Sequence, residues 1–250
     1  MSLSFREKLL QGETLIGCIQ TLPATEVSEL LGKIGFDWLF IDLEHSALDI
    51  GQAQRIVQGA QSLLSCVIRC PGNDEVWIKK CLDLGVDGII IPQVKTRAEA
   101  QFAVDCGKYP PLGRRSVGLA RAQGYGLEFE AYVTQANSRV ALVIQIEHIQ
   151  GVHNIDAILG VAGIDAVFVG PYDLSASLDK TGALGAPEVV EAISTVRAAC
   201  AKRHIPLGIF GASADAVKPF MTQGYQLIAV GTDALLLGSS ARQVLAELRS

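Results

Sequence analysis

The sequence has no apolar run of the roughly 18 or more residues that a membrane-spanning helix needs. Residues 1–11 are mixed in character and include Arg6, Glu7 and Lys8, so they lack the apolar segment of a signal peptide. These absences predict a protein that neither spans a membrane nor is exported, and we expect it in the cytoplasm.

Charged residues are scarce, at 19% of the chain, and the formal net charge of −5 comes without any basic tract. Nucleic-acid partners need clustered Lys and Arg, so we expect none. The cysteines form no CxxC pair, which predicts neither a zinc centre nor a disulfide framework. We expect buried free thiols in a reducing compartment. The six are Cys18, Cys66, Cys70, Cys81, Cys106 and Cys200.

Hydrophobic residues are abundant, at 49%, and runs rich in β-branched residues alternate with longer stretches of helical periodicity. Eight strand-then-helix units with apolar strands favour a parallel sheet covered on both faces. We expect a single-domain (β/α)8 TIM barrel over residues 1–250, with a doubly wound open sheet as the alternative. So much apolar surface also favours a homo-oligomer. The expected strands are 15–20, 37–43, 65–69, 88–93, 140–147, 165–170, 206–210 and 227–231.

Helical patterns fill the intervals and precede the first strand. Residues 4–11 predict a short N-terminal helix, and residues 52–63 give the weakest pattern of the set. Residues 110–126 interrupt the rhythm with a long loop rich in Gly and Arg, typical of a lid or a subunit contact. The other expected helices are 24–35, 74–84, 98–106, 127–136, 152–159, 187–202, 214–223 and 234–248.

Polar side chains gather where several strands end, and the active site of such a barrel lies at the carboxyl ends of its strands. Glu147 ends the fifth strand and Asp173 follows the sixth. Gln145 points the same way as Glu147, because alternate residues of a strand share a face. Two carboxylates without a cysteine suit a hard cation such as Mg²⁺ or Mn²⁺. The alternative is that Glu147 is a strand-end charge paired with a lysine or arginine.

Arg69 ends an apolar strand, where an isolated buried charge would be too costly. We expect it to stabilise an enolate oxygen near the metal, or else to form a structural ion pair with Asp42 or Glu44. His45 follows these carboxylates and suits general acid–base chemistry, with helix capping or a structural hydrogen bond as the alternatives. The other histidines, His148, His153 and His204, are interpreted as structural.

The sequence lacks the residues expected for a phosphate-binding site and for Schiff-base catalysis. The expected seventh and eighth strands end without Lys or Arg, which disfavours a phosphorylated substrate. Lys79 and Lys80 fall in a helix and Lys95 follows the fourth strand by a turn, so no lysine stands where a Schiff base would need it.

Five separated segments resemble the HpcH/HpaI family of metal-dependent, class II pyruvate aldolases. They occur in one order, and the resemblance extends over about residues 5–245 without large gaps. The segments are 35–46 GFDWLFIDLEHS, 69–74 RCPGND, 109–118 YPPLGRRSVG, 144–147 IQIE and 169–176 VGPYDLSA.

The resemblance implies reversible cleavage of a 4-hydroxy-2-oxoacid into pyruvate and an aldehyde through a metal-bound pyruvate enolate. It implies Glu147 and Asp173 as ligands of Mg²⁺ or Mn²⁺, with Co²⁺ as a further option. Gln145 and the backbone at Tyr172 and Asp173 would hold the pyruvate carboxylate. Smaller residues also occur at the position of Tyr172 in such proteins, so this tyrosine affects the size of the pocket. A homo-oligomer, specifically a hexamer, is implied as well.

The same resemblance assigns Arg69 to stabilisation of the enolate, His45 to the general base, and Asp83 to the acid that raises the basicity of His45. About ten helical residues at 1.5 Å each separate Asp83 from the helix start that follows Arg69. Asp83 should therefore lie at the opposite end of its own barrel. We expect it to reach His45 of a neighbouring subunit, or else to be a helix-end surface charge.

Three rival functions remain open. A CoA-thioester lyase of the citryl- or malyl-CoA type would need a basic docking surface, for which Arg114, Arg115 and Arg121 are the candidates. An enzyme that hydrolyses or decarboxylates a small oxoacid through an enolate is the second. A non-catalytic barrel that serves as a binding or scaffold subunit is the third, because a fold alone does not define a function.

Overall fold

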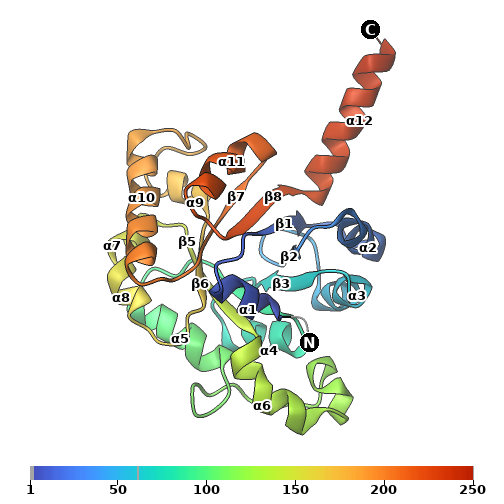
Figure 1. The fold of residues 1–250 in the computed structure, drawn as a ribbon, viewed down its shortest axis with the longest axis vertical. Helices are drawn as coiled ribbons and strands as arrows, with labels where there is room; N and C mark the ends of the chain where they lie inside the picture. The colour runs from blue at the N-terminus through green and yellow to red at the C-terminus, as the bar shows by residue number, and fades with distance from the viewer. Residues whose placement is uncertain (1–2, 61, 250) are drawn as a thin grey trace.

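Eight parallel strands close into a barrel, and helices surround it (Figure 1). The strands are β1 (Leu15–Gln20), β2 (Trp38–Asp42), β3 (Ser65–Arg69), β4 (Gly88–Ile91), β5 (Ala141–Ile146), β6 (Ala166–Val169), β7 (Leu207–Gly211) and β8 (Leu227–Thr232). The computed structural model describes residues 3–60 and 62–249. Each strand pairs with the next, and β1 pairs with β8, for example Leu15 with Leu227. This pairing closes the sheet, so the predicted (β/α)8 barrel is confirmed and the doubly wound alternative is wrong.

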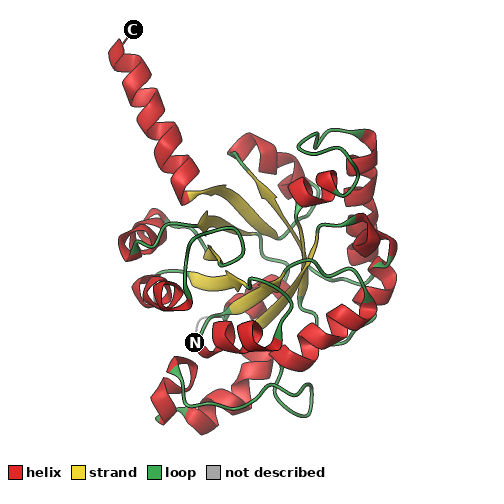
Figure 2. Ribbon diagram, turned by 180° about the vertical axis from the view of Figure 1, so that it is seen from behind, coloured by secondary structure: helices red, strands yellow, loops and turns green. Residues whose placement is uncertain are grey.

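Helices form the outer ring, which Figure 2 shows from behind. They are α1 (Phe5–Leu10), α2 (Thr25–Ile34), α3 (Ile50–Ala60), α4 (Glu75–Asp83), α5 (Arg97–Gly107), the 3₁₀ helix η1 (Arg121–Gly126), α6 (Phe129–Arg139), α7 (Ile149–His153), α8 (Ile155–Leu159), α9 (Pro171–Ala176), α10 (Pro187–Lys202), α11 (Ala214–Thr222) and α12 (Asp233–Arg249). None of the helices in the described part of the chain has the length and apolar content to cross a membrane.

The expected helices are confirmed with three differences. Residues 152–159 were expected as one helix, but α7 and α8 meet at Asn154, which leaves helical geometry with φ −98° and ψ 8°. The loop 110–126 contains η1 at its end, where Gly124 and Tyr125 have positive φ. α9 was not expected, because the six-residue segment that begins with Pro171 is too short to show a helical period.

The interior of the barrel is apolar over most of its length. Trp38, Phe40 and Phe168 fill it, with ring centroids 5.8 Å apart for Trp38 and Phe40 and 5.6 Å apart for Phe40 and Phe168. α1 covers the end at which the strands begin, called the bottom here, and Phe5 packs 6.0 Å from Trp38. The opposite end, called the mouth, is therefore the end left for a site.

A repeated contact holds the strand starts at the bottom. Before each even-numbered strand, a glycine with positive φ is followed two residues later by Asp or Gln. The side-chain oxygen of that residue accepts the backbone N–H at or near the start of the preceding strand, and such pairing avoids an unsatisfied backbone donor. The contacts are Asp37 with Ile16 (2.8 Å), Asp87 with Cys66 (2.8 Å), Asp165 with Leu142 (2.8 Å) and Gln226 with Leu207 (3.0 Å).

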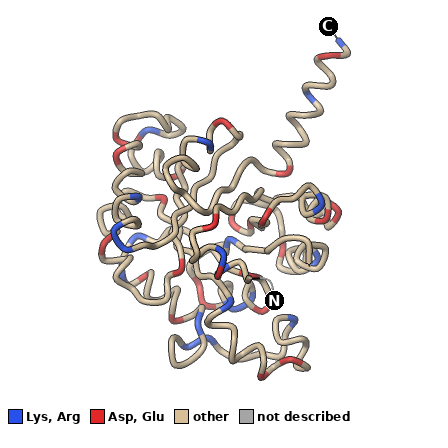
Figure 3. Tube along the Cα trace, in the orientation of Figure 1, with Lys and Arg blue, Asp and Glu red and all other residues tan. Residues whose placement is uncertain are grey.

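The last helix leaves the barrel. α12 forms where a helix was expected, but it projects away from the ring rather than covering β8 (Figure 1). Its apolar side chains are exposed, with Leu237 at 66% and Leu248 at 80%. Figure 3 shows few charges along it. An apolar helix of 17 residues held away from its own chain is a surface that another molecule would cover.

The six cysteines are buried free thiols, as expected. Burial raises the pKa of Cys18 and of Cys200 to about 12, so these thiols stay protonated and inert at neutral pH.

Candidate active site

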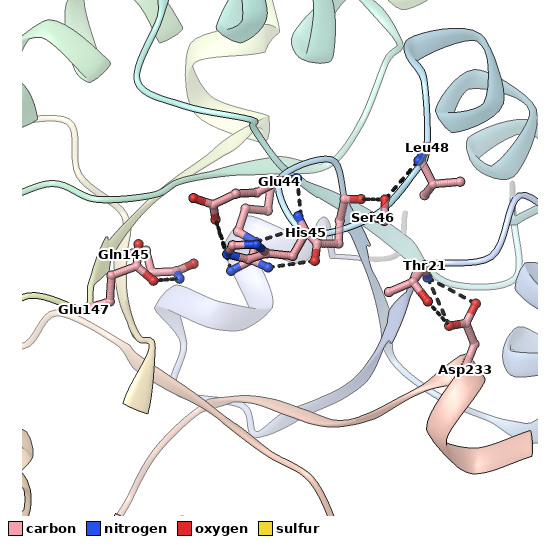
Figure 4. A network of polar contacts seen from close by, with 10 residues as sticks. Thr21, Glu44, His45, Ser46, Leu48, Gln145, Glu147 and Asp233 are labelled. Atoms are coloured by element: carbon pink, nitrogen blue, oxygen red, sulfur yellow. Dashed lines mark hydrogen bonds and ion pairs between the residues drawn. The ribbon is translucent and has the colours of Figure 1, made fainter. Parts of the chain in front are cut away.

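Side chains facing into the barrel become polar at the mouth. Asp42 at the end of β2 lies directly opposite Arg69 at the end of β3 in the parallel register. Gln145 and Glu147 come from the end of β5, and Figure 4 shows them beside Glu44. Asp42, Arg69, Gln145 and Glu147 are all at most 8% exposed. The structure therefore brings together a buried cluster of charges drawn from three strands.

Two carboxylates hold the guanidinium of Arg69. Its Nε and Nη2 donate to the two oxygens of Asp42 at 2.9 and 2.7 Å, and its Nη1 lies 3.2 Å from Oε2 of Glu44. The guanidinium carbon also lies 5.2 Å from the centre of the Phe40 ring. The ion pairs expected as the structural alternative are confirmed. They offset the cost of burying the charge and fix the guanidinium at the mouth.

His45 is placed at the mouth by the turn that follows β2. Its backbone N–H and that of Glu44 donate to Oδ1 of Asp42 at 3.2 and 3.0 Å. Burial alone would raise the pKa of Asp42, but these bonds and the Arg69 guanidinium hold that pKa below its ordinary value. The imidazole is 61% exposed, and its Nε2 lies 3.8 Å from Oε2 of Glu44. An accessible imidazole beside a carboxyl group is able to exchange protons with a substrate.

Glu147 is held by two donors. The backbone N–H of Gln93 donates to its Oε1 at 2.7 Å, and Gln93 adopts a φ of +57° to do so. Nε2 of Gln145 donates to its Oε2. Oε1 of Gln145 is buried and has no hydrogen-bond partner among the described residues. A buried acceptor is normally bonded to protein, water or a ligand, so this oxygen is available to a water or a small molecule bound at the mouth.

Gly170 approaches Glu147 and Gln145 from β6. A Cβ added at Gly170 would lie 2.6 Å from Oε2 of Glu147 and 3.0 Å from Nε2 of Gln145. The separation from Glu147 is shorter than non-bonded atoms tolerate and that from Gln145 is tight, so a side chain at this position would displace the Glu147 carboxylate. Glycine therefore lets the backbone after β6 approach Glu147 closely and leaves the carboxylate in place.

Asp173 lies in the first turn of α9, next to Tyr172. Both were expected at the end of the sixth strand, and the short helix α9 displaces them from the strand onto the rim of the mouth. Asp173 is exposed. Tyr172 is 44% exposed, and its ring centre lies 6.1 Å from that of Phe210 on β7.

Negative charge exceeds positive charge at the mouth. Burial and the neighbouring carboxylates Glu147, Asp42 and Asp173 raise the pKa of Glu44 to about 7, although Arg69 opposes the shift. Burial also raises the pKa of Glu147, with Asp173 adding to it. The carboxyl groups of Asp42, Glu44, Glu147 and Asp173 lie near the single guanidinium of Arg69. A bound cation would reduce the repulsion among these carboxylates.

The residues present fit a hard divalent cation. Glu147 and Asp173 would supply carboxylate oxygens, and Gln145 has a buried oxygen that lacks a partner among the described residues. Among the described residues, no group of three or more His, Cys, Asp or Glu side chains is arranged as a complete metal site. Two protein carboxylates are therefore the set to consider, with further ligands left to small molecules.

Asp83 lies at the end of α4, away from the mouth. Its Oδ1 accepts from Nη2 of Arg115 at 2.8 Å, and the guanidinium of Arg115 stacks 4.4 Å from the ring centre of Tyr109. The Asp83 side chain is 20% exposed. It is thus neither a free surface charge nor, among the described contacts, a partner of His45 within the same chain.

The buried lysine of the described chain lies at the bottom. Lys108 is 4% exposed, and its Nζ contacts the carbonyl of Val140 at 3.0 Å and Oδ2 of Asp165 at 3.2 Å. Burial lowers its pKa, as in a Schiff-base lysine, but its partners are at the starts of β5 and β6. Its role is structural.

A cavity of about 1230 Å³ also lies at the bottom, between α6 and the starts of β3 and β4. Its lining includes Asp37 and Asp87, whose oxygens accept backbone N–H groups of neighbouring strands. These two acids thus have structural roles, and the mouth remains the candidate site.

Several groups at the mouth were not singled out from the sequence. Asp42 and Glu44 entered only as ion-pair partners of Arg69, although their spacing in the segment DLEHS marks them as strand-end acids. Gln93 acts through its backbone, and Gly170 acts through the side chain it lacks. A single sequence contains no pattern from which these two roles could be predicted.

The fold and the charged mouth define a barrel of the aldolase type, and three comparisons agree. The sequence profile described as HpcH/HpaI aldolase/citrate lyase matches residues 22–239. This chain belongs to that family.

Individual relatives cover nearly the whole chain. The chain is 35% identical to a hydroxypyruvate/pyruvate aldolase of Roseobacter denitrificans, over 98% of this chain and 96% of the relative. It is 36% identical to a 5-keto-4-deoxy-D-glucarate aldolase of Escherichia coli K12, over 97% and 95%. The crystal structure of a family member from Burkholderia cenocepacia superposes with a TM-score of 0.94 at 32% identity, over 98% of both chains.

Proposed function

We propose that this protein is a metal-dependent aldolase, a carbon–carbon lyase that reversibly cleaves a 4-hydroxy-2-oxoacid into pyruvate and an aldehyde. The observation that carries the proposal is the buried Oε1 of Gln145, which has no hydrogen-bond partner among the described residues and lies beside Glu147, where Gly170 allows close approach of β6. The names of the Roseobacter and Escherichia relatives both describe aldolases, which supports the same reaction class.

Glu147 and Asp173 would hold the metal, Mg²⁺ or Mn²⁺ with Co²⁺ as a further option. When bound, the metal supplies Lewis-acid polarisation of the oxoacid and so lowers the barrier to enolate formation. Gln145, through the second hydrogen of its Nε2, and the backbone N–H groups of Tyr172 and Asp173 would orient the carboxylate of the oxoacid. The two backbone N–H groups lie in the first turn of α9, where backbone donors have no partner within the helix.

Arg69 stabilises the developing enolate, and His45 transfers the proton of the 4-hydroxyl group. Arg69, fixed by Asp42, places a positive charge where the enolate oxygen develops. His45 takes the proton from the 4-hydroxyl group during cleavage and returns it during addition. The imidazole is accessible enough for this role.

We further propose a homo-oligomer, a hexamer, in the cytoplasm, with small oxoacids and aldehydes as its partners. The exposed leucines of α12 support an assembly. Asp83 would reach His45 of a neighbouring subunit and raise its basicity. Arg115, itself buried against Tyr109, fixes the position of Asp83 at the end of α4.

The geometry gives less support to a CoA-thioester lyase. Arg114 pairs with Glu75 at 3.2 Å, Arg115 pairs with Asp83, and Arg121 donates to the carbonyl of Leu84. These three guanidinium groups therefore contact their own chain instead of forming a basic docking surface.

The test is pyruvate release from a panel of 4-hydroxy-2-oxoacids before and after metal removal by a chelator. We expect release by the metal-loaded protein, loss after chelation, and recovery when Mg²⁺ or Mn²⁺ is restored. Release that persists after complete metal removal would overturn the proposal.

A further inference from the structure

Tyr172 and Phe210 form an aromatic pair on the rim of the mouth. Their ring centres lie 6.1 Å apart and their planes are inclined by 50°. Phe210 faces into the barrel and packs against the interior apolar cluster, while Tyr172 is 44% exposed. A tyrosine ring with that much exposure, beside a half-buried phenylalanine, leaves aromatic surface accessible at the rim of the mouth.

The strand register places this pair beside Glu147. Ile146 pairs with Val169, and Val169 pairs with Ile209. The same register carried one residue further sets Gly170 between Glu147 on one side and Phe210 on the other. Glu147, Gly170 and Phe210 are thus successive neighbours across β5, β6 and β7 at the mouth, and the aromatic pair lies one strand beyond Gly170. An oxoacid held at Glu147 therefore has its carbon chain beside Phe210 and Tyr172.

This part of the mouth has no cation of its own. The segments that follow β1, β6, β7 and β8, namely residues 21–24, 170–178, 212–216 and 233–237, contain no Lys or Arg. The next lysines along the chain, Lys180 and Lys218, form ion pairs with Glu188 and Asp215. Arg69 is already paired with Asp42 and Glu44. An anionic group on the carbon chain, beyond the oxoacid atoms that the metal would bind, would thus meet an aromatic face and carboxylates, with no lysine or arginine of these segments to balance it.

We infer that Tyr172 and Phe210 form the wall that receives the carbon chain of the aldehyde half, and that this wall selects uncharged aldehydes over those bearing a carboxylate or phosphate. The inference rests on the proposed aldolase function and names the class of its second substrate. The negative faces of the rings favour C–H groups and disfavour an anion, and the pair lies where the carbon chain must pass.

The experiment measures aldol addition of pyruvate to aldehydes matched in length. Butanal and succinic semialdehyde both have four carbons and differ in a terminal methyl against a terminal carboxylate. Glyceraldehyde and glyceraldehyde 3-phosphate give a second pair. We expect kcat/KM for the neutral member of each pair to exceed that of the anionic member by about tenfold or more. Equal values, or a preference for the anionic member, would overturn the inference.

Two substitutions of Tyr172 test whether the aromatic wall causes the preference for neutral aldehydes. Tyr172→Arg adds a cation to the wall and should shift the neutral-to-anionic ratio of kcat/KM toward the anionic aldehyde by about tenfold, whereas Tyr172→Phe should keep the ratio. Tyr125→Arg adds the same charge at an exposed tyrosine in η1, away from the mouth, and should leave the ratio as in the unsubstituted protein. A ratio that Tyr172→Arg does not change would contradict the assignment.

Exchange of the pyruvate methyl protons in D₂O tests the proposed function separately, since it needs no aldehyde. If metal-dependent exchange occurs and the neutral preference does not, the aldolase assignment stands and this inference is wrong. If neither exchange nor cleavage occurs, the proposed function fails and the inference fails with it.

Discussion

Asp42 binds Arg69 through both of its carboxylate oxygens, at 2.9 Å from Nε and 2.7 Å from Nη2. The two residues are exact neighbours across β2 and β3, so the backbone register itself sets this contact. The pairing occupies one edge of the guanidinium and fixes its plane. Nη1 remains on the side of Glu44 and the mouth.

We expect Arg69→Lys to lower kcat by about 10²- to 10³-fold, because a single ammonium group cannot reproduce a two-point contact with Asp42 and a third point at the mouth. The charge is retained, so the midpoint of urea unfolding should change little compared with Arg69→Ala. Steady-state kinetics and urea titration check both expectations. An unchanged kcat would show that the planar guanidinium is not required.

Gly170→Ala should abolish metal binding and activity together. The added Cβ would lie 2.6 Å from Oε2 of Glu147, so the carboxylate must move. Calorimetric titration with Mn²⁺ measures the loss, and circular dichroism checks the fold. Gly185→Ala is the matched control, since a Cβ there meets nothing within 4 Å, and it should bind Mn²⁺ normally. Normal binding by Gly170→Ala would contradict the assignment of Glu147 as a ligand.

Glu44→Gln should remove a pH dependence of stability. The pKa of Glu44 is about 7 in the folded protein against an ordinary 4.5, so the folded state keeps this proton to higher pH. The free energy of unfolding of the unsubstituted protein therefore falls as pH rises from about 4.5 to about 7, by about 2 to 3 kcal/mol from this group. Urea unfolding at pH 5 and pH 7.5, without divalent cations, measures the difference.

Two controls accompany that measurement. Glu188→Gln replaces an exposed carboxylate in the first turn of α10 and should leave the fall in stability in place. Added Mg²⁺ should reduce the fall in the unsubstituted protein, because a cation at the mouth stabilises the ionised form of Glu44. A Glu44→Gln variant with the original pH dependence would refute the assignment.

Mixing two inactive variants tests whether Asp83 acts across subunits. His45→Ala lacks the proposed base, and Asp83→Asn lacks its proposed partner. If each site takes His45 from one subunit and Asp83 from another, reassembled mixtures regain activity in about a quarter of their sites. If Asp83 acts within its own chain, the mixture gains nothing over the separate variants. Pyruvate release after co-refolding is the readout.

Most of the fold followed from periodicity. Eight apolar runs separated by helical patterns predicted the barrel, and the strand bounds differ by at most two residues from those expected. Residues 152–159 were expected to be helical, but their division into α7 and α8 was not, and α9 was not expected, because segments of five or six residues show no helical period of their own. The projection of α12 away from the barrel was not predicted for a different reason. A helical sequence shows which face is apolar, but it does not show whether that face packs on its own chain or on another molecule.

The contacts that hold the strand starts at the bottom depend on a spacing that the sequence contains but that does not by itself predict them. Gly35, Gly85, Gly163 and Gly224 each precede Asp or Gln by two residues, at every second strand. The roles of Asp37 and Asp87 in binding backbone N–H groups require coordinates, since a lone Asp before a strand is also common in turns.

At the site, strand ends predicted the mouth residues Arg69, Gln145 and Glu147 correctly, because barrel geometry turns alternate residues inward. The ion pairs of Arg69 were also anticipated. Glu44 was undervalued, because its raised pKa depends on burial and on three other acids brought together from different strands. Phe210 lay in an apolar strand with nothing to distinguish it from the core.

Asp233 begins α12, and its carboxylate accepts hydrogen bonds from the backbone N–H groups of Thr21 and Leu22 at 2.9 to 3.1 Å (Figure 4). The hydroxyl of Thr21 adds a further bond at 2.8 Å. A single buried side chain thus joins the root of the projecting helix to the loop that follows β1 at the rim. A molecule bound to α12 would therefore contact a helix whose first residue is hydrogen-bonded to the rim of the mouth.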